Sequence, residues 1–411
     1  MESAGKNKRV LIIVENLPLP FDRRVWQEAT TLKQSGYQVS IICPEGKGYE
    51  KRFEVIEGIH IYRHPLPFEA DGALGYLLEY STALFWEFYL AWKIQLTRGF
   101  DIIHACNPPD LIFLIAVFFK LLGKKFVFDH HDINPELYEA KFGKKDIFYK
   151  LMLLFERLTF KSADVSIATN ESYKRIAIQR GGMDSNKVFI VRSGPSLERL
   201  KIVPPVESLK NGRKYLVGYV GVMGKQEGID YLLESVKYIV YTLGRTDIQF
   251  GLVGGGTEID NMKRMASDLG VSEYVTFTGR VPDKELLEML NTSDICVNPD
   301  IANEMNDKST MNKIMEYMAL GKPIVQFDLA EGRVSAQKSS LYALKNNATD
   351  FADKIVELLE KPELMEKMAK IGKARVINEL EWCHEEPKLL AAYAALIKNK
   401  GTIFKTIQRQ Q

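Results

Sequence analysis

The sequence predicts an α/β protein made of two doubly wound, Rossmann-like domains. In both halves, short continuous apolar strands alternate with helices, a pattern that indicates a mostly parallel sheet covered on both faces. At 411 residues the chain is long enough for two domains of ordinary size. The segment 198–214 contains Pro204 and Pro205, several charges and little periodicity. We therefore interpret it as the linker between the two series.

In the first half, expected strands cover residues 10–14, 38–43, 59–63, 101–105, 125–129, 164–168 and 187–191. Expected helices cover residues 23–35, 74–97, 110–122, 147–161 and 171–180. Ligands of such sheets bind at the carboxyl ends of the strands. Polar residues stand at those ends here: Glu15, Asn16, Asn107, residues 130–132, Asn170, and Ser193 with Gly194.

In the second half, expected strands cover residues 215–221, 248–253, 275–278, 295–298 and 324–327. Expected helices cover residues 229–242, 258–269, 283–291, 311–320 and 350–359. The closing stretch 362–398 is predicted to be helical, with a break near residues 382–387.

The stretch 298–328 combines a strand end, a long polar loop and a helix. Ser309 or Thr310 is the expected helix cap, and Gly321 with Pro323 ends the helix. A loop-to-helix junction offers unpaired backbone N–H groups and a positive dipole end, which suit a phosphate. A carboxylate in the next turn, Glu316, can accept hydrogen bonds from a sugar diol. An ordinary βαβ unit with an exposed glutamate explains the same spacing.

The composition narrows the functional class. Hydrophobic residues make up 46% and charged residues 26%, as in a soluble globular protein. The net charge of +2 gives no global field that would attract nucleic acid. The cysteines Cys43, Cys106, Cys296 and Cys383 lack paired spacing, so we expect reduced thiols, a cytoplasmic location and no zinc motif. The longest apolar run, 111–119, falls short of the roughly 20 residues that span a bilayer.

Three glycine-bearing turns follow predicted strands in the second half, at residues 221–228, 254–256 and 275–280. Taken singly, each is an ordinary tight connection. None fits G-x-G-x-x-G in the first βα turn, which counts against a nicotinamide or flavin enzyme. We expect no bound cofactor.

In this order the motifs resemble glycosyltransferase family 4, retaining enzymes of the GT-B fold that use nucleotide-sugar donors. The matching stretches of the second half are YVGVMGKQEGIDYLLESV, LVGGGTEID, YVTFTGRVPDKELLEML, SDICVNPD and NKIMEYMALGKPIV. Those of the first half are ENLPLPFDRRVWQEA, LKQSGYQVSII, DIIHACNPPDL and KFVFDHHDINPELY. The resemblance implies two domains that face each other across a cleft. It assigns residues 1–197 to an acceptor-side domain, 198–214 to the linker, 215–381 to a nucleotide-sugar domain and 382–411 to a helix returning to the first domain.

The resemblance also implies roles for residues of the second domain. Glu316 matches the family glutamate that holds the ribose hydroxyls. The remaining matches are Ser309, Thr310 and Met311 beside the sugar and diphosphate, Arg280 and Val281 beside the base, and Gly221, Gly224 and Gly255 in the turns nearby.

The sequence departs from the family at charged positions. The first motif glutamate falls on Lys308, and Asp307 is the candidate that replaces it with a one-residue shift. The usual basic pair of the first glycine turn falls on Val222 and Glu227. Because charge that develops on the leaving diphosphate dominates the barrier, we expect Lys225 or Lys313 to supply the positive charge.

In the first domain, His131 matches the histidine that family members place beside the donor sugar, flanked by His130 and Asp132. Glu136 follows in the same turn, and we place it toward the acceptor. A surface turn capped by Asp132 explains the local sequence equally well. No metal is expected, since successive side chains diverge and GT-B enzymes generally need none.

The segment 141–161 is basic and carries apolar residues at helical spacing. Such a helix lies on an anionic membrane or packs on the sheet with solvated lysines. The aromatic-rich stretch 74–92 is either a second part of a membrane-facing surface or core. We therefore consider peripheral contact with the inner membrane face alongside a cytoplasmic location.

These expectations amount to transfer of a hexose or N-acetylhexosamine from a nucleotide diphosphate sugar, UDP-linked, to a hydroxyl of a glycan or lipid-linked acceptor in surface polysaccharide or glycoconjugate synthesis. The anomeric configuration would be retained. Two alternatives stay open at this point: a noncatalytic GT-B protein that binds nucleotide sugar or partners another transferase, and a GT-B sugar-nucleotide epimerase.

Overall fold

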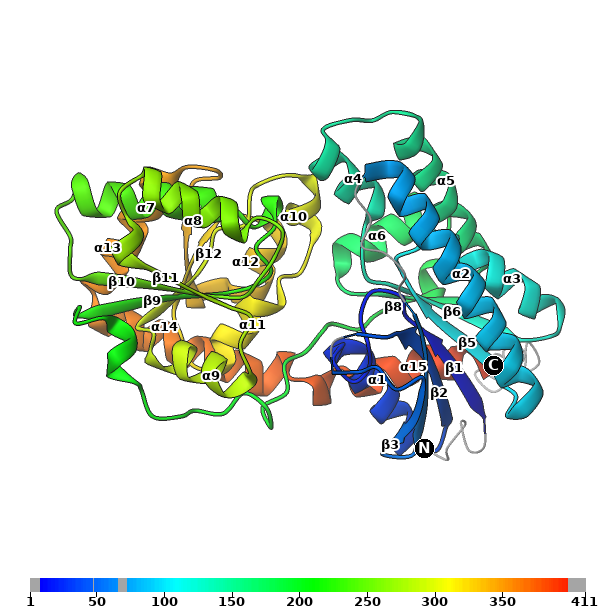
Figure 1. The fold of residues 1–411 in the computed structure, drawn as a ribbon. Coiled ribbons are helices and arrows are strands. Elements are labelled where there is room, and N and C mark those ends of the chain that lie inside the picture. The colour runs from blue at the N-terminus through cyan, green and yellow to red at the C-terminus, as the bar shows by residue number, and fades with distance from the viewer. Residues whose placement is uncertain (1–7, 47, 66–71, 398–411) are drawn as a thin grey trace, which may run out of the picture. The chain divides into compact units, whose positions relative to one another are not determined.

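Two parallel sheets, each covered by helices, organise the chain (Figure 1). The computed structural model describes residues 8–46, 48–65 and 72–397. They divide into two compact units. Of these residues, unit 1 holds those within 8–139, 143–193 and 385–397, and unit 2 holds residues 140–142 and 194–384.

Unit 1 contains an eight-stranded sheet in the order β3-β4-β2-β1-β5-β6-β7-β8. All neighbouring strands are parallel except β3, which pairs antiparallel with β4 at the sheet edge. The strands are β1 (Arg9–Ile13), β2 (Gln38–Pro44), β3 (Phe53–Ile56), β4 (Ile59–His64), β5 (Ile102–Cys106), β6 (Lys125–His130), β7 (Val165–Ala168) and β8 (Val188–Ile190). The helices are α1 (Arg23–Gln34), α2 (Gly72–Thr97), η1 (Asp110–Ile112), α3 (Phe113–Leu121), α4 (Asn134–Phe142), α5 (Ile147–Ser162), α6 (Glu171–Gln179) and η2 (Ser185–Lys187).

Unit 2 contains a six-stranded parallel sheet in the order β11-β10-β9-β12-β13-β14. The strands are β9 (Tyr215–Val220), β10 (Ile248–Val253), β11 (Val275–Gly279), β12 (Ile295–Asn298), β13 (Ile324–Phe327) and β14 (Ser340–Ala343). Its main helices are α7 (Ile229–Tyr241), α8 (Ile259–Asp268), α9 (Asp283–Thr292), α10 (Glu304–Lys308), α11 (Asn312–Ala319), α12 (Ala330–Ala336), α13 (Ala348–Leu359) and α14 (Pro362–Arg375). Short helical turns are η3 (Glu207–Lys210), η4 (Lys225–Glu227), η5 (Ser272–Tyr274), η6 (Gln337–Ser339), η7 (Val376–Leu380) and η8 (Trp382–His384).

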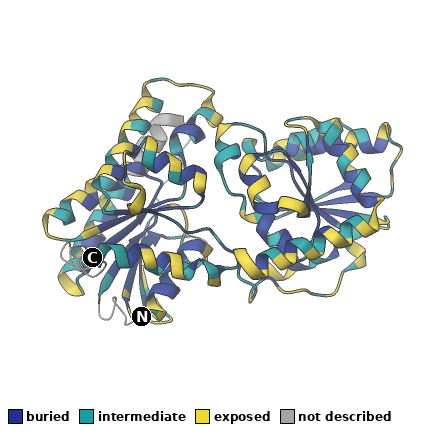
Figure 2. Cartoon of the chain, turned by 180° about the vertical axis from the view of Figure 1, so that it is seen from behind, coloured by how far each residue is buried: buried dark blue, intermediate teal, exposed yellow. Residues whose placement is uncertain are grey.

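Both sheets are buried between layers of helices, and Figure 2 shows the strands in the colour of buried residues and the outer helix faces in that of exposed ones. Burial on both faces explains why the strands read as continuous apolar runs. The helices bury one face only; α13, for example, buries Phe351, Ala352, Ile355 and Leu358 at helical spacing. The prediction of two doubly wound α/β units is thereby confirmed.

The last helix, α15 (Glu386–Ile397), follows unit 2 in the chain but packs against β7, β8 and α1 of unit 1. Its Tyr393 is fully buried there. The expected linker, by contrast, packs on unit 2, where Leu200 is part of the hydrophobic core.

Several elements differ from the expected ones. The sequence analysis missed β3, β14, α4, α10 and α12. Three of these are short, since β3 and β14 have four residues each and α10 has five. The helix expected to begin at a Ser309 or Thr310 cap starts at Asn312 instead, with Met311 as the N-cap residue and no side-chain capping bond. Ser309 ends α10, and its hydroxyl donates to the carbonyl of Met305.

A buried ion cluster joins α4, α5 and the end of α6 in unit 1. Arg180 contacts Glu136 at 2.8 Å and Glu156 at 2.5 Å, and both carboxylates are buried. Burial raises the pKa of Glu156 to about 7 although Arg180 opposes that shift. Glu136, placed toward the acceptor by the sequence analysis, therefore faces inward, because its carboxylate is needed to balance Arg180.

We predict that Arg180→Met lowers the free energy of unfolding by about 3 kcal/mol, because it leaves two buried carboxylates without their cation. A carboxyl whose pKa is raised on folding adds stability below its unfolded pKa and loses it as the pH rises through the folded value. The pKa of Glu156 rises from 4.5 to about 7, so the deficit of the variant should be smaller at pH 5 than at pH 8. Urea unfolding at the two pH values measures it.

Lys370→Met is the matched control, since the Lys370–Glu366 pair is exposed on both sides. Its effect should stay within about 0.5 kcal/mol at either pH. An Arg180→Met deficit of equal size at both pH values would contradict the assignment.

Candidate active site

In unit 1 the polar residues gather at the carboxyl ends of β1, β5 and β6, next to the point where the strand order reverses between β1 and β5. Ligands of doubly wound sheets bind at such a reversal. Asn107, after β5, organises the loop that follows β6. Its Oδ1 accepts from the amide of His131 at 2.7 Å and from that of Asp132 at 3.2 Å, and its Nδ2 donates to the carbonyl of Asp132. His131 and Asp132 are thus held at the sheet edge as half-buried residues.

The His131 ring rests on a buried carboxylate. Its Nε2 lies 2.5 Å from Asp129 Oδ2 and 2.9 Å from Arg24 Nε. A nitrogen that donates to a carboxylate cannot also accept from a guanidinium, so we assign the Nε2 proton to the shorter Asp129 bond. In the neutral ring, Nδ1 is then an acceptor, and within the described residues it meets no polar group. The arrangement presents one basic nitrogen at the sheet edge.

Beneath His131 lies a charge network that the sequence analysis missed. Arg24 of α1 contacts Asp129 at 2.9 Å and Glu28 at 3.1 Å, and all three side chains are buried. Burial opposes ionisation of Asp129, but Arg24 and His131 hold its pKa well below the usual range. Burial, followed by repulsion from Asp129, raises the pKa of Glu28 well above its usual range. Asp129 therefore carries the negative charge of the pair.

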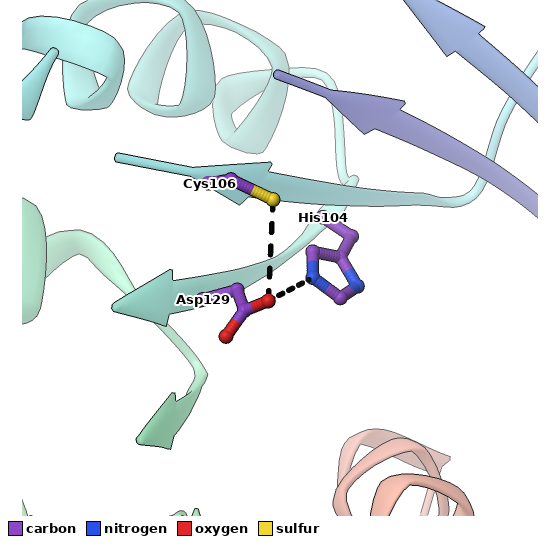
Figure 3. Close-up of side chains that lie close together, drawn as sticks. All are labelled: His104, Cys106 and Asp129. Atoms are coloured by element: carbon purple, nitrogen blue, oxygen red, sulfur yellow. Dashed lines mark hydrogen bonds and ion pairs between the residues drawn. The ribbon is translucent and has the colours of Figure 1, made fainter. Parts of the chain in front are cut away.

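Figure 3 shows His104 and Cys106 of β5 directed at Asp129 of β6. His104 Nε2 lies 3.4 Å from Asp129 Oδ2, and its Nδ1 lies 2.7 Å from the hydroxyl of Tyr393 in α15. Burial lowers the pKa of His104 and raises that of the Cys106 thiol. Histidine, cysteine and carboxylate ligands of this kind can hold a metal, but here Arg24 already supplies the positive charge beside Asp129.

His130, the other histidine of the pair, does not join His131. It is buried, and the rings of Phe128, Phe160 and Tyr173 surround it. Burial lowers its pKa to about 3, so it is neutral at physiological pH.

In unit 2 the strand order reverses between β9 and β12, and three glycine turns meet at the carboxyl edge near this point. The amide of Met223 donates to the carbonyl of Gly255 at 2.9 Å, and the amide of Gly254 donates to that of Gly279 at 2.9 Å. Gly254 has a φ of +134°, and a Cβ there would lie 1.8 Å from the carbonyl oxygen of Gly221. Only glycine lets the backbones approach this closely.

A second buried charge cluster lies at this edge. Lys313, at the start of α11, contacts Glu227 at 2.6 Å and Asp300, after β12, at 2.8 Å. Burial opposes the ammonium charge, but Asp300 and Glu227 raise the pKa of Lys313 well above its usual value. Burial raises the pKa of Asp300 to about 7, with Lys313 opposing and Glu227 adding to the shift. The positive charge of Lys313 is therefore already balanced by two carboxylates, so Lys313 is a weaker candidate for stabilising the charge of a leaving diphosphate.

The other predicted residues of unit 2 occupy the loops around this cluster. Lys225 in η4 is exposed, and within the described residues its ammonium meets no carboxylate. Asp307 Oδ1 lies 3.0 Å from Lys345 and accepts from the amide of Ala330 at 3.1 Å, so its carboxylate anchors the start of α12. Gly224 begins η4, and Thr310 and Met311 lead into the uncapped start of α11.

Glu316 lies in the second turn of α11 with its carboxylate paired to Arg199, which the sequence analysis did not single out. Arg199 also approaches Asp283 of α9 at 3.6 Å. Val281 is half-buried and Arg280 exposed in the turn that follows β11. The structure thus gathers Gly221, Gly255, Lys313, Arg280 and the start of α11 around one strand edge, whereas Asp307 is turned toward α12.

Two family models match the chain. The model described as Glycosyltransferase Family 4 matches residues 22–199, and the one described as Glycosyl transferases group 1 matches residues 214–361. The 2-deoxystreptamine glucosyltransferase of Streptomyces kanamyceticus is 20% identical over 308 residues, 72% of this chain and 78% of that relative. The alpha-D-kanosaminyltransferase of the same organism is 24% identical over 156 residues, 38% of this chain and only 39% of that relative.

Solved structures show the same fold. Sucrose-phosphate synthase from Thermosynechococcus elongatus superposes with a TM-score of 0.75 at 17% identity, covering 95% of this chain and 99% of that one. The Anabaena HepE protein in complex with UDP-glucose gives a TM-score of 0.72 at 14% identity, covering 94% and 100%. With both units matched, the chain carries a Glycosyltransferase Family 4 domain in its first half and a Glycosyl transferases group 1 domain in its second half, and it has the GT-B fold.

Proposed function

We propose that this glycosyltransferase moves a hexose or N-acetylhexosamine from a UDP-linked sugar to a hydroxyl of a glycan or lipid-linked acceptor, with retention of the anomeric configuration. The observation that carries the proposal is the uncapped start of α11 beside the β9/β12 reversal, with Glu316 one turn further in. Free helix N–H groups bind phosphate, and a carboxylate a turn away suits a ribose diol.

The donor half of the proposal draws on unit 2. Because Gly254 and Gly256 lack a Cβ, the second glycine turn packs directly on the backbone of Gly221 and Met223 in the first, and such closely packed backbone turns suit a diphosphate. The exposed ammonium of Lys225 lies in the turn after β9 and is the better source of charge for the leaving group than Lys313. The complexes of the Anabaena HepE protein with UDP and with UDP-glucose support a UDP-linked donor by analogy.

Unit 1 is proposed to contribute His131. Its Nδ1, which meets no polar group among the residues that the structure describes, is suited to a hydroxyl of the transferred sugar, and Asp129 fixes the ring that carries it. The acceptor hydroxyl can attack on the face that the phosphate leaves, and the departing phosphate can take its proton. The protein then needs to supply neither a base nor a covalent nucleophile. Retention then follows from front-face attack. The role of Asp307 near the sugar stays a prediction, since its carboxylate contacts Lys345.

Peripheral contact with a membrane is part of the proposal. The outer face of α5 exposes Ile147 by 63%, Phe148 by 46% and Leu154 by 48%, with Lys144, Lys145 and Lys150 exposed nearby. Exposed apolar groups flanked by lysines suit an anionic lipid surface. Within the described residues, none of the helices has the combination of length and hydropathy needed to cross a bilayer.

Incubation with a panel of nucleotide sugars, with and without a membrane extract, tests the function. We expect sugar transfer from a UDP-linked donor that requires the extract, and a product whose anomeric configuration, determined by NMR, matches that of the donor. Conversion of the donor without any acceptor would indicate an epimerase, and an inverted product would contradict the proposed chemistry.

We predict that Glu316→Ala weakens UDP binding by about 1.5–3 kcal/mol, because charged hydrogen bonds to the ribose are lost. Arg199→Ala should weaken it less, since Arg199 only orients the carboxylate. Isothermal titration calorimetry measures both, and Glu363→Ala, which removes an exposed glutamate of α14, is the control. Unchanged affinity in Glu316→Ala, with an unchanged melting temperature, would refute the ribose role.

We predict that Lys225→Met lowers kcat at saturating donor on the order of a hundredfold, as when one electrostatic donor to a developing charge is removed. Its melting temperature should stay unchanged, because the side chain is exposed. Lys225→Arg, which keeps the charge, should retain most of the turnover.

Lys313→Met should behave differently. It leaves Glu227 and Asp300 without their cation, so we expect a loss of about 3–5 kcal/mol in unfolding free energy. Full turnover in Lys225→Met together with an undiminished melting temperature in Lys313→Met would show that both assignments are wrong.

A further inference from the structure

A long groove crosses unit 1 between α2 and the β3–β4 edge of the sheet. It has a volume of about 1120 Å³, and a smaller depression of about 290 Å³ adjoins it. Gln38 and Arg98 line both, so the smaller depression continues the groove at the Arg98 end. The part of α2 from Phe85 to Thr97 that lines the groove is about 18 Å long at 1.5 Å per residue.

The charged residues that line this groove, among those the structure describes, are cationic. Among the described residues that line it there is no aspartate or glutamate, and six are cationic: Arg9, Lys33, Arg52, Arg63, Lys93 and Arg98. The whole chain carries a net charge of only +2, so this is a local concentration. Burial, together with Arg98 and Lys33, lowers the pKa of His60 in the smaller depression, which agrees with a positive local potential.

Three of these cations have partners at the rim, and three do not. Arg9 pairs with Asp101, Arg52 with Glu45 and Arg63 with Glu54. The charged ends of Lys33, Lys93 and Arg98 are exposed and meet no carboxylate within the described residues. These three are available to a negatively charged ligand.

The cations stand at both ends of the groove. Arg52 and Arg63 lie together at the carboxyl end of β4, where the amide of Arg63 donates to the carbonyl of Arg52. Arg98 lies at the opposite end, near the start of β1, since its carbonyl accepts from Arg9. A lipid tail that filled the groove would desolvate the charges at both ends, which is unfavourable. A flat bilayer surface does not follow a groove between a helix and a strand.

Aromatic side chains form the walls between these charges. Phe85 is 67% exposed, Tyr89 51% and Phe53 49%, and Trp86 is half-buried beside them. Such rings pack on the apolar faces of sugar rings while charged groups nearby bind acidic substituents. A groove with rings along its walls and cations at its ends suits a chain of sugars that carry acidic groups.

We infer that this groove binds an anionic glycan, a chain of sugars that carry carboxylate or phosphate groups, and holds the body of the acceptor during transfer. The inference rests on the proposed function and specifies its acceptor class. At the end of the groove beside the carboxyl end of β4, the side chain of Arg63 donates to the carbonyl of Leu19. Leu19 belongs to the loop after β1, so this end of the groove adjoins that loop. Arg24, the contact of His131, lies in α1 directly after that loop.

Binding of a fluorescent oligogalacturonate to the full chain, without donor, tests the groove. Oligogalacturonate carries one carboxylate per sugar, and its methyl ester is the neutral match. We expect the acid to bind and the ester to bind far more weakly. The triple variant Lys33→Gln/Lys93→Gln/Arg98→Gln should bind the acid about tenfold more weakly, since each exposed charge contributes modestly.

The matched control is Lys338→Gln/Lys367→Gln/Lys373→Gln, which removes the same charge from exposed positions of unit 2 and should leave the affinity unchanged. Equal binding of acid and ester, or an unchanged affinity in the groove triple, would overturn the inference. So would tighter binding of oligouridylate that the groove triple abolishes, because the groove would then be a site for single-stranded nucleic acid.

A kinetic arm separates this inference from the proposed function. With a transferase assay in hand, the groove triple should raise KM for a long anionic acceptor and leave kcat and KM for a short neutral acceptor unchanged. If the wild-type protein transferred sugar to none of the acceptors, the proposed function would be refuted. The groove could still be tested, because the binding assay needs no turnover.

Discussion

The buried charge of Asp129 is the constraint on which the arrangement of unit 1 depends. A carboxylate without solvent is stable only if charges and donors surround it. Here they come from separate elements: Arg24 from α1, His104 from β5 and His131 from the loop after β6. The same carboxylate therefore fixes how a helix and two strands meet and how the histidine at the sheet edge is oriented. Fold and site share one electrostatic requirement.

Unit 2 meets a similar requirement with the opposite sign. The cation of Lys313 is enclosed by Glu227 and Asp300, and its proximity to Tyr219 adds a ring contact. This cluster gives a physical reason for the departure at residue 227, where the family pattern has a basic residue: a glutamate there balances the lysine of α11. The exposed Lys225 lies outside this cluster and among the described residues pairs with no carboxylate.

The repeated features of the chain could be predicted from sequence, because they leave local patterns. Alternating apolar strands and helices identified both sheets, the glycine turns follow strands as expected, and Glu316 lies in the expected helix. The ion clusters could not be predicted in this way, since Arg24 and Asp129 are 105 residues apart and His104 and Tyr393 are 289 apart. Glu136 was misjudged for the same reason: its partner Arg180 lies 44 residues further on. The cap of α11 was missed because five residues of an unexpected helix, α10, take up the polar loop.

The position of α15 has a consequence for how the protein is made. Tyr393 and the rest of this helix cover β7 and β8 of unit 1, yet the ribosome adds them only after the whole of unit 2. At the usual rate of about 5–20 residues per second, the roughly 190 intervening residues take on the order of 10–40 s to synthesise. During that interval the nascent first unit exposes His104, Tyr37 and the apolar surface that α15 later buries. Unit 1 is therefore completed only after unit 2 has been synthesised, and during that interval its uncovered apolar surface is open to aggregation.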